Sequence, residues 1–450
     1  MRNLRRVLFV LAVVVVISLF GSTLTWAQTS PTTDELQKKI DDLEKQIVDV
    51  KAQLASMPPA APATPPPPAA APASAPAAAP APAPTGLAAL LGPTTLSGFV
   101  DVYYGYNSNQ PAGRTTALRN FDINSGQFGL NMIELIADKA TSTDSRVGYH
   151  VSLGFGQAMN LVNGFEAASP RVPTTPSFPI PTQTNFDQYL KEGYIEYLAP
   201  TGKGLTIDFG KFVTNAGAEV IETKDNWNYS RGLLFSWAIP YYHFGLRAKY
   251  AFNGKVALTG FLLNGWNNVV DNNTGKTTGF TLALTPTKKL SIYENYYVGP
   301  EQANNNGNFR HMTDTVVAYN ANSKLSLMAN YDYGHEAFTG ISPVWWSGFA
   351  GYIKYAPNAK WAVATRGEYF IDHNGFSTGT AQKVGEFTGT LDHTLAGHII
   401  SRLEYRRDMS DQNVFPYRTS EIPGSTFLPM DHQNTVTVGL VYAFTTAPPQ

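Results

Sequence analysis

The sequence predicts an all-β fold: a transmembrane antiparallel β-barrel of about 16 strands, preceded by a short N-terminal coiled-coil helix. Three observations predict it. Segments of about ten residues alternate apolar with small or polar side chains from Leu96 to Phe444. Short and long connections alternate between these segments, and an export signal opens the chain. The composition agrees with these three observations, because 23 Tyr, 25 Phe and 38 Gly with only 15% charged residues are typical of many short strands and tight turns.

Residues 1–27 match a secretory signal peptide. Basic residues precede the apolar run from Val7 to Phe20, and a small-residue stretch ending at Ala27 supplies a cleavage position. The alternative is a membrane anchor. At about 1.5 Å per residue this run falls short of a hydrocarbon core of about 30 Å, so the pattern favours removal of the segment.

Residues 28–57 carry the pattern of a coiled-coil helix. The apolar positions are spaced alternately four and three apart, which places them on one seam of a supercoiling helix. They are Leu36, Ile40, Leu43, Ile47, Val50, Leu54 and Met57. Because a lone helix of this length is marginal in water, the seam predicts self-association. The alternative is a helix that lies on a membrane or on the barrel mouth.

Residues 58–94 are expected to form a linker. From Pro58 to Pro84 the chain is almost purely Ala and Pro, a composition that buries no core and favours extended polyproline II. Such a segment would hold the helix away from the barrel on its periplasmic side.

The barrel is predicted over residues 95–445. Val147, Tyr149, Val151, Leu153 and Phe155 alternate with glycines and polar residues, and several later segments repeat the pattern. We therefore expect an apolar exterior and a wet interior of small and polar side chains. A soluble sandwich also alternates, so the pattern alone does not establish a membrane protein.

The connection lengths distinguish the two rims of the barrel. Five short links, near 200–203, 252–255, 286–289, 320–324 and 357–360, are rich in turn formers. Eight long links fall near 108–125, 158–187, 212–240, 264–276, 299–312, 335–344, 372–383 and 409–432. Eight outer loops give sixteen strands, although segments 126–139 and 384–392 alternate poorly. A barrel of this size leaves an aqueous channel.

The last strand and the aromatic residues support a membrane barrel. An unbroken apolar stripe, Val436, Val438, Leu440, Tyr442 and Phe444, resembles the terminal strand of outer-membrane barrels. Residues 446–450 continue past it as a C-terminal tail. Trp345, Trp346, Trp361 and many Tyr at strand ends suit interfacial girdles, although packing explains any one of them.

Several function classes find no support. The 33 basic and 34 acidic residues give no basic surface for nucleic acid. With no cysteine there is no thiolate metal site, and the eight His lack metal or nucleophile spacing. Asp392-His393 and Asp431-His432 are adjacent pairs that point to opposite faces of a strand. The sequence therefore predicts no cofactor, no metal and no enzyme.

Four segments resemble the porin-2 family of outer-membrane β-barrel porins over roughly 95–444. They are LSGFVDVYY at 96–104, FGKFVTNAGAE at 209–219, DNWNYSR at 225–231 and NGWNN at 264–268. The resemblance implies an outer-membrane porin that passes small polar solutes and ions by diffusion. By analogy, a homo-oligomer is expected, with a trimer favoured, embedded in outer-membrane lipids with the N-terminal helix in the periplasm.

The third outer link, Lys211 to Pro240, is expected to fold inward and narrow the channel, as in general porins. Its polar residues form the predicted constriction: Glu219, Glu222, Lys224, Asp225, Asn226, Asn228 and Arg231. Alternation gives the predicted pore wall: Arg247, Lys249, Arg366, Glu368, Arg402, Glu404 and Arg406. The alternative is that these are ordinary solvated lumen residues. Opposed charges orient polar solutes, and their mixed signs predict weak ion selectivity.

Two other functions remain open at this point. The chain could be a structural tether, in which the N-terminal helix contacts the cell wall and the barrel is only an anchor. It could also be an outer-membrane barrel hydrolase, because Ser, His and Asp occur in the loops. Conductance separates these alternatives, since a wide pore supports diffusion and a closed barrel supports the tether.

Overall fold

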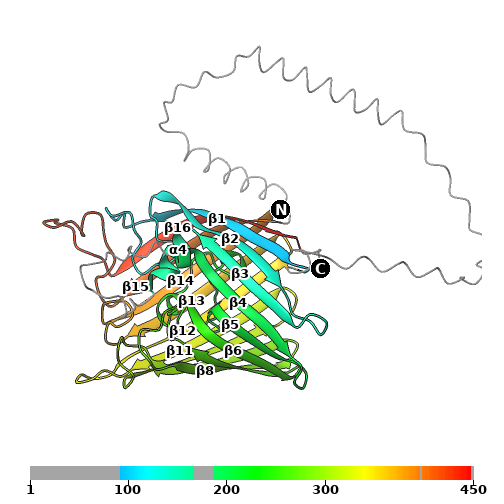
Figure 1. Ribbon diagram of the computed structural model, residues 1–450. Helices are drawn as coiled ribbons and strands as arrows, with labels where there is room; N and C mark the ends of the chain where they lie inside the picture. The colour runs from blue at the N-terminus through cyan, green and yellow to red at the C-terminus, as the bar shows by residue number, and fades with distance from the viewer. Residues whose placement is uncertain (1–91, 166–185, 396–397, 447–450) are drawn as a thin grey trace, which may run out of the picture. The chain divides into compact units, whose positions relative to one another are not determined.

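Sixteen antiparallel strands close into one barrel (Figure 1). The computed structural model describes residues 92–165, 186–395 and 398–446. The predicted signal peptide, coiled-coil helix and most of the linker lie outside these residues, as does most of the C-terminal tail. Within the described ranges, no helix is long and apolar enough to cross a membrane.

The strands have the lengths expected for crossing a bilayer. They are β1 Thr95–Asn107, β2 Gln127–Lys139, β3 Val147–Phe155, β4 Leu190–Ala199, β5 Leu205–Val213, β6 Tyr242–Asn253, β7 Val256–Leu263, β8 Thr277–Thr287, β9 Leu290–Pro300, β10 Phe309–Asn320, β11 Leu325–Glu336, β12 Val344–Asn358, β13 Trp361–Asp372, β14 Gln382–Leu395, β15 Ile399–Ser410 and β16 His432–Thr445. The prediction of sixteen strands is confirmed, and the two poorly alternating segments are β2 and β14.

Each strand pairs with its neighbours in the sequence, and β1 pairs with β16 to close the cylinder. That closing ladder runs from Ser97 opposite Thr445 to Asn107 opposite Thr435. Closure removes the free sheet edges that lipid does not tolerate, because every backbone polar group then has a partner.

Short turns gather on one rim, as predicted, and side chains fix them. The Asn253 carboxamide accepts the amides of Lys255 at 2.8 Å and Val256 at 3.0 Å. Asn358 does the same for Lys360 at 2.9 Å and Trp361 at 3.1 Å. These Asx turns explain why Asn ends both β6 and β12. We call this the inner rim, and the rim with the eight long connections the outer rim.

The outward stripe of most strands is largely apolar and exposed, as lipid contact requires. On β16, Val436 is 41% exposed, Val438 52% and Leu440 44%. The terminal stripe predicted from the sequence therefore faces the outside of the barrel. Figure 1 shows β16 beside β1, and the exposed Val102, Tyr104 and Tyr106 continue the apolar stripe on β1.

The interior differs from the expectation of a wet lumen, because it also contains an apolar core. Phe99, Phe212, Trp346 and Phe370 point inward and are buried. They pack with residues of long connections that fold into the barrel. These connections carry the short helices α4 Gln157–Val162, η1 Asn163–Phe165, η2 Phe186–Tyr189, η3 Thr223–Asp225 and α5 Leu233–Trp237. The expectation of only small and polar side chains inside was wrong, because folded-in loops need apolar wall to pack against.

Candidate functional site

The third outer connection, residues 214–241, crosses the interior of the barrel; we call it the β5–β6 loop. Near its start, the amide of Gly217 donates to Asp314 on β10 at 3.0 Å. Further along, the Tyr229 hydroxyl donates to Asp101 on β1 at 2.8 Å. Strands β10 and β1 lie on nearly opposite sides of the closed barrel. The loop therefore spans the lumen.

Charged side chains on β13 hold one side of this loop. The Arg366 guanidinium contacts Glu219 of the loop at 2.6 Å, the carbonyl of Ser230 at 2.7 Å and Glu386 on β14 at 2.8 Å. Its side chain is 0% exposed. The neighbouring Glu368 accepts the amide of Leu233 at the start of α5.

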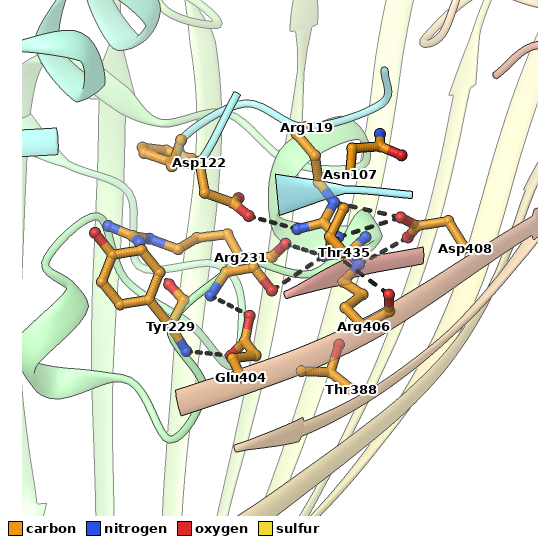
Figure 2. Close-up of polar contacts among 12 residues, drawn as sticks. Asn107, Arg119, Asp122, Tyr229, Arg231, Thr388, Glu404, Arg406, Asp408 and Thr435 are labelled. Atoms are coloured by element: carbon orange, nitrogen blue, oxygen red, sulfur yellow. Dashed lines mark hydrogen bonds and ion pairs between the residues drawn. The ribbon is translucent and has the colours of Figure 1, made fainter. Parts of the chain in front are cut away.

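Charged side chains on β15 hold the same loop in the same way, as Figure 2 shows for two of them. Glu404 accepts the amides of Tyr229 at 2.6 Å and Ser230 at 2.9 Å. Arg406 donates to the carbonyl of Arg231 at 2.7 Å and pairs with Asp408 at 2.7 Å. Arg402, also on β15, pairs with Asp392 at 2.8 Å and donates to the carbonyl of Asn226 at 2.7 Å.

These contacts have one physical cause. The β5–β6 loop has no sheet partner, yet most of it is buried, so its amides and carbonyls need other hydrogen-bond partners. Carboxylates supply acceptors for the amides, and guanidiniums supply donors for the carbonyls. We call this surface the anchor wall: Arg366, Glu368, Glu386, Arg402, Glu404 and Arg406.

The predicted constriction residues are mostly paired inside this assembly. Glu219 contacts Arg366, and Glu222 contacts Lys191 on β4. Asn228 donates to Thr390 on β14 at 2.7 Å, and Asn226 accepts the amide of Val220 at 2.9 Å. Arg231 is buried, with its guanidinium 4.5 Å from the ring centroid of Phe121. Lys224 and Asp225, 2.5 Å apart, keep side-chain exposures of 27% and 53%.

The two remaining predicted wall residues lie on the other side of the barrel. Arg247 on β6 pairs with Asp208 on β5 at 2.7 Å and lies 4.5 Å from the ring of Phe212, with 18% of its side chain exposed. Lys249 is exposed. Glu196 on β4 faces the same interior and is half-buried. We call Glu196, Arg247 and Lys249 the open wall.

Another outer loop, residues 108–126, also reaches this site, which was not predicted. Arg119 contacts Asp122 at 2.5 Å and Asp408 at 3.2 Å, and donates to Thr435 at 2.8 Å (Figure 2). The only sequence signal for Asp408 is its inward position in the alternation of β15. In the part of the chain that the structure describes, no three His, Asp or Glu side chains are arranged to hold a metal ion.

Comparison with known proteins agrees with this architecture. The model of the family described as beta-barrel porin-2, OmpL-like, matches residues 93–444. An anion-selective porin from Comamonas acidovorans is 10% identical, with 78% of this chain and 99% of that chain covered and a TM-score of 0.52. OmpT of Vibrio cholerae in a trimer form is 11% identical, with 78% and 99% covered and a TM-score of 0.50.

A further solved structure, OmpF of Salmonella typhi in complex with daunomycin, is 11% identical, with 78% and 97% covered and a TM-score of 0.50. At these identities the structures share the fold alone. No curated protein matches the chain. The family match extends over nearly the whole described barrel, so the chain belongs to the beta-barrel porin-2, OmpL-like family.

Proposed function

We propose that this protein is a non-enzymatic outer-membrane porin that passes small polar solutes and ions by diffusion. The observation that carries the proposal is a closed sixteen-strand barrel whose lumen is crossed by an inward loop that charged side chains of β13 and β15 hold. Because many hydrogen bonds and ion pairs hold the β5–β6 loop in a fixed position, the loop narrows the interior of the barrel in a defined way. Family membership and the shared porin fold support the same role.

The solute path in this proposal runs between the β5–β6 loop and the open wall. On the loop side, Lys224 and Asp225 keep exposed charge, and on the wall side Arg247, Lys249 and Glu196 do so. Opposed charges across a narrow passage orient polar solutes and exclude apolar ones. Because both signs are present, only weak ion selectivity is expected. The buried predicted residues act by holding the loop.

We also propose that the protein works as a homo-oligomer in the outer membrane, with a trimer favoured. The heptad pattern of residues 28–57 calls for partner helices, and a protein of shared fold has a trimer form. In this arrangement the N-terminal helix lies in the periplasm, where the same segment would contact the cell wall.

Planar-bilayer recording on the refolded full-length chain tests the channel. We expect ohmic steps of current, arriving in threes if the protein is a trimer. A barrel that inserts without conducting would contradict the proposal and favour an anchoring role instead. Hydrolysis of added lipid or peptide by the same preparation would favour an enzyme.

A further inference from the structure

A cavity of about 240 Å³ lies at the outer rim, at the end of the β5–β6 loop; we call it the mouth pocket. This is below the roughly 300 Å³ at the lower end of sites for drug-sized ligands, so it suits one small ring. Its lining comes from the loop, β10, β12 and two other outer connections: Ser236, Trp237, Ile239, Tyr241, Trp266, Asn267, Arg310, Trp346, Phe376 and Ser377.

The aromatic part of this pocket is fixed by its own packing. Trp346 stacks on Phe376, with ring centroids 5.3 Å apart and planes 21° apart, and meets Trp266 edge to face at 6.2 Å. Its indole donates to the carbonyl of Ala238 in the β5–β6 loop at 3.0 Å. Phe376 is nevertheless 37% exposed, and Trp266 is half-buried. The Arg310 guanidinium lies over both rings, 4.8 Å from the centroid of Trp266 and 5.2 Å from that of Phe376. A flat solute therefore meets preformed ring surfaces with a guanidinium beside them.

The pocket holds little net charge. Arg310 pairs with the buried Glu336 on β11 through Nε at 2.8 Å and Nη2 at 2.6 Å. The nearby Glu301 accepts the amide of Trp266 at 2.7 Å and the hydroxyl of Thr277 at 2.5 Å, and burial raises its pKa. The guanidinium charge is thus balanced inside the protein, which favours a neutral occupant over an anion.

Three polar groups of the lining have no hydrogen-bond partner among the described residues: Nη1 of Arg310 and the hydroxyls of Ser236 and Ser377. Ring surfaces with a few unpaired donors are what a pyranose requires, since its faces are apolar and its edge carries hydroxyls. We propose that the mouth pocket binds a single neutral sugar ring before it enters the channel. This inference rests on the proposed channel function and adds a solute class to it.

Sugar block of the ion current tests this inference. D-glucose, the open-chain polyol sorbitol and the aromatic anion benzoate are each added to the outer side of a bilayer that holds the full-length protein. We expect saturable block by glucose and weaker block by sorbitol. Phe376→Ala should weaken the glucose effect by roughly two- to tenfold, as expected for one ring contact. Trp361→Ala, on the outward stripe at the inner rim, is the matched control and should change nothing.

The outcomes separate the two proposals. Normal current with equal, non-saturable effects of glucose and sorbitol overturns the sugar site and leaves the channel intact. Block by benzoate alone, lost in Phe376→Ala, makes the pocket an anion site and also overturns it. If no current flows, the channel proposal fails. Quenching of tryptophan fluorescence by glucose, compared between the natural protein and Phe376→Ala, then still tests whether the mouth pocket binds the sugar: quenching that Phe376→Ala weakens supports the site, and equal or absent quenching overturns it.

A second inference starts from a carboxylate on the outer surface of the barrel. Glu294 is the fifth residue of β9 and points outward, because its neighbour Asn295 is buried in the interior. Its two oxygens accept the hydroxyls of Thr313 at 2.7 Å and Thr315 at 2.6 Å on β10. These threonines flank the inward Asp314. Among the described strands, Glu294 is the only carboxylate on the outward face.

A carboxylate halfway along a strand is unfavourable against lipid tails, so such a residue points to a function or a partner. The predicted helical seam of residues 28–57 independently calls for a second copy of the chain. We infer that the patch formed by Glu294, Thr313 and Thr315 lies in the contact between copies. This inference rests on the proposed homo-oligomer and adds to it the face of the barrel that is buried between copies.

Thiol labelling tests this face, because the chain has no cysteine of its own. Ala329→Cys on β11 lies beside the patch, and Val438→Cys on β16 lies on a distant part of the outward surface. We expect a lipid-soluble maleimide to label position 329 at least tenfold more slowly than 438 in the native protein, and equally after heat dissociation. Equal labelling rates at positions 329 and 438 in an intact oligomer would overturn the proposed contact face but not the proposal of an oligomer. A monomer in native gels, labelled equally at both positions, overturns both.

Glu294→Leu gives a second readout of the same patch. If the patch contacts another copy through polar groups, the variant should shift the native gel from oligomer toward monomer. If Glu294 faces lipid instead, the oligomer should persist, and the variant should unfold at a higher temperature. The second result contradicts the inference.

Discussion

The anchor wall and the open wall are built from the same sequence pattern but have different roles. Arg366 and Arg406 of the anchor wall point inward by alternation, and so do Arg247 and Lys249 of the open wall. The first pair is fully buried against the β5–β6 loop, whereas Arg247 keeps 18% of its side chain exposed. How much water an inward charge contacts therefore depends on how closely the β5–β6 loop packs against it.

This difference has energetic consequences. A buried guanidinium with several carboxylate and carbonyl partners leaves those partners unpaired when it is removed. The pair of Arg247 with the buried Asp208 has fewer partners, and part of the Arg247 side chain stays in water, so this pair contributes less to stability. Substitutions on the anchor wall should therefore change structure and conductance, while those on the open wall should change selectivity.

The largest expected effect is that of Arg366→Ala. It leaves Glu219 buried without its cation and removes one of the two guanidiniums that contact Glu386, and breaking such a buried pair costs about 3–5 kcal/mol. We expect a loosened β5–β6 loop, a larger single-channel conductance and faster cleavage within the loop by added protease. Lys249→Ala is the control, because this side chain is exposed and its removal should cost at most about 1 kcal/mol. Equal conductance changes in both variants would remove the distinction between the walls.

A smaller effect is expected for Glu404→Gln. The carboxylate accepts two loop amides and the hydroxyl of Thr390 at 2.7 Å, and the isosteric amide keeps only one acceptor oxygen. Hydrogen bonds to a charged group contribute about 1.5–3 kcal/mol, so partial loosening should follow. Increased noise in the open-channel current would report this loosening of the β5–β6 loop. Noise that matches the natural protein would mean that the loop is held well enough without this carboxylate.

Sequence reasoning reached the barrel but not the anchoring of its loop. Strands and turns follow from local rules, the two-residue period and the Asn turns at Asn253 and Asn358, so their number and order were predictable. The pairing of Glu219 with Arg366 joins residues 147 positions apart, and no local pattern encodes it. The apolar interior was missed for the same reason. An inward Phe99 is buried only because a distant part of the chain folds into the barrel and packs against it.

A still smaller effect, without loss of stability, is expected from charge reversal at exposed positions. Lys224→Glu and Lys249→Glu should each shift the reversal potential in a salt gradient toward cations, because both amines retain contact with water. Arg231→Glu, by contrast, replaces a buried cation beside Phe121 with a carboxylate, and this variant should reduce the folding yield. A selectivity change in Arg231→Glu with unchanged yield would place this side chain in the water path.

The smallest expected effect concerns a carboxyl group that has no direct cation partner, in contrast to Glu219. Burial raises the pKa of Glu301 above its ordinary value of 4.5, and its closest contacts are the neutral Trp266 amide and Thr277 hydroxyl. Because the folded form prefers the proton, its stability contribution is complete below pH 4.5 and declines as the pH rises toward the raised pKa. Melting of the natural protein, followed by tryptophan fluorescence from pH 4 to pH 8, should therefore show a small decline that Glu301→Gln lacks. Glu421→Gln, on an exposed outer loop, is the control and should keep the natural profile. Identical profiles in all three proteins would mean that Glu301 stays charged in the folded barrel, and that its environment resembles the anchor wall more than its neutral contacts suggest.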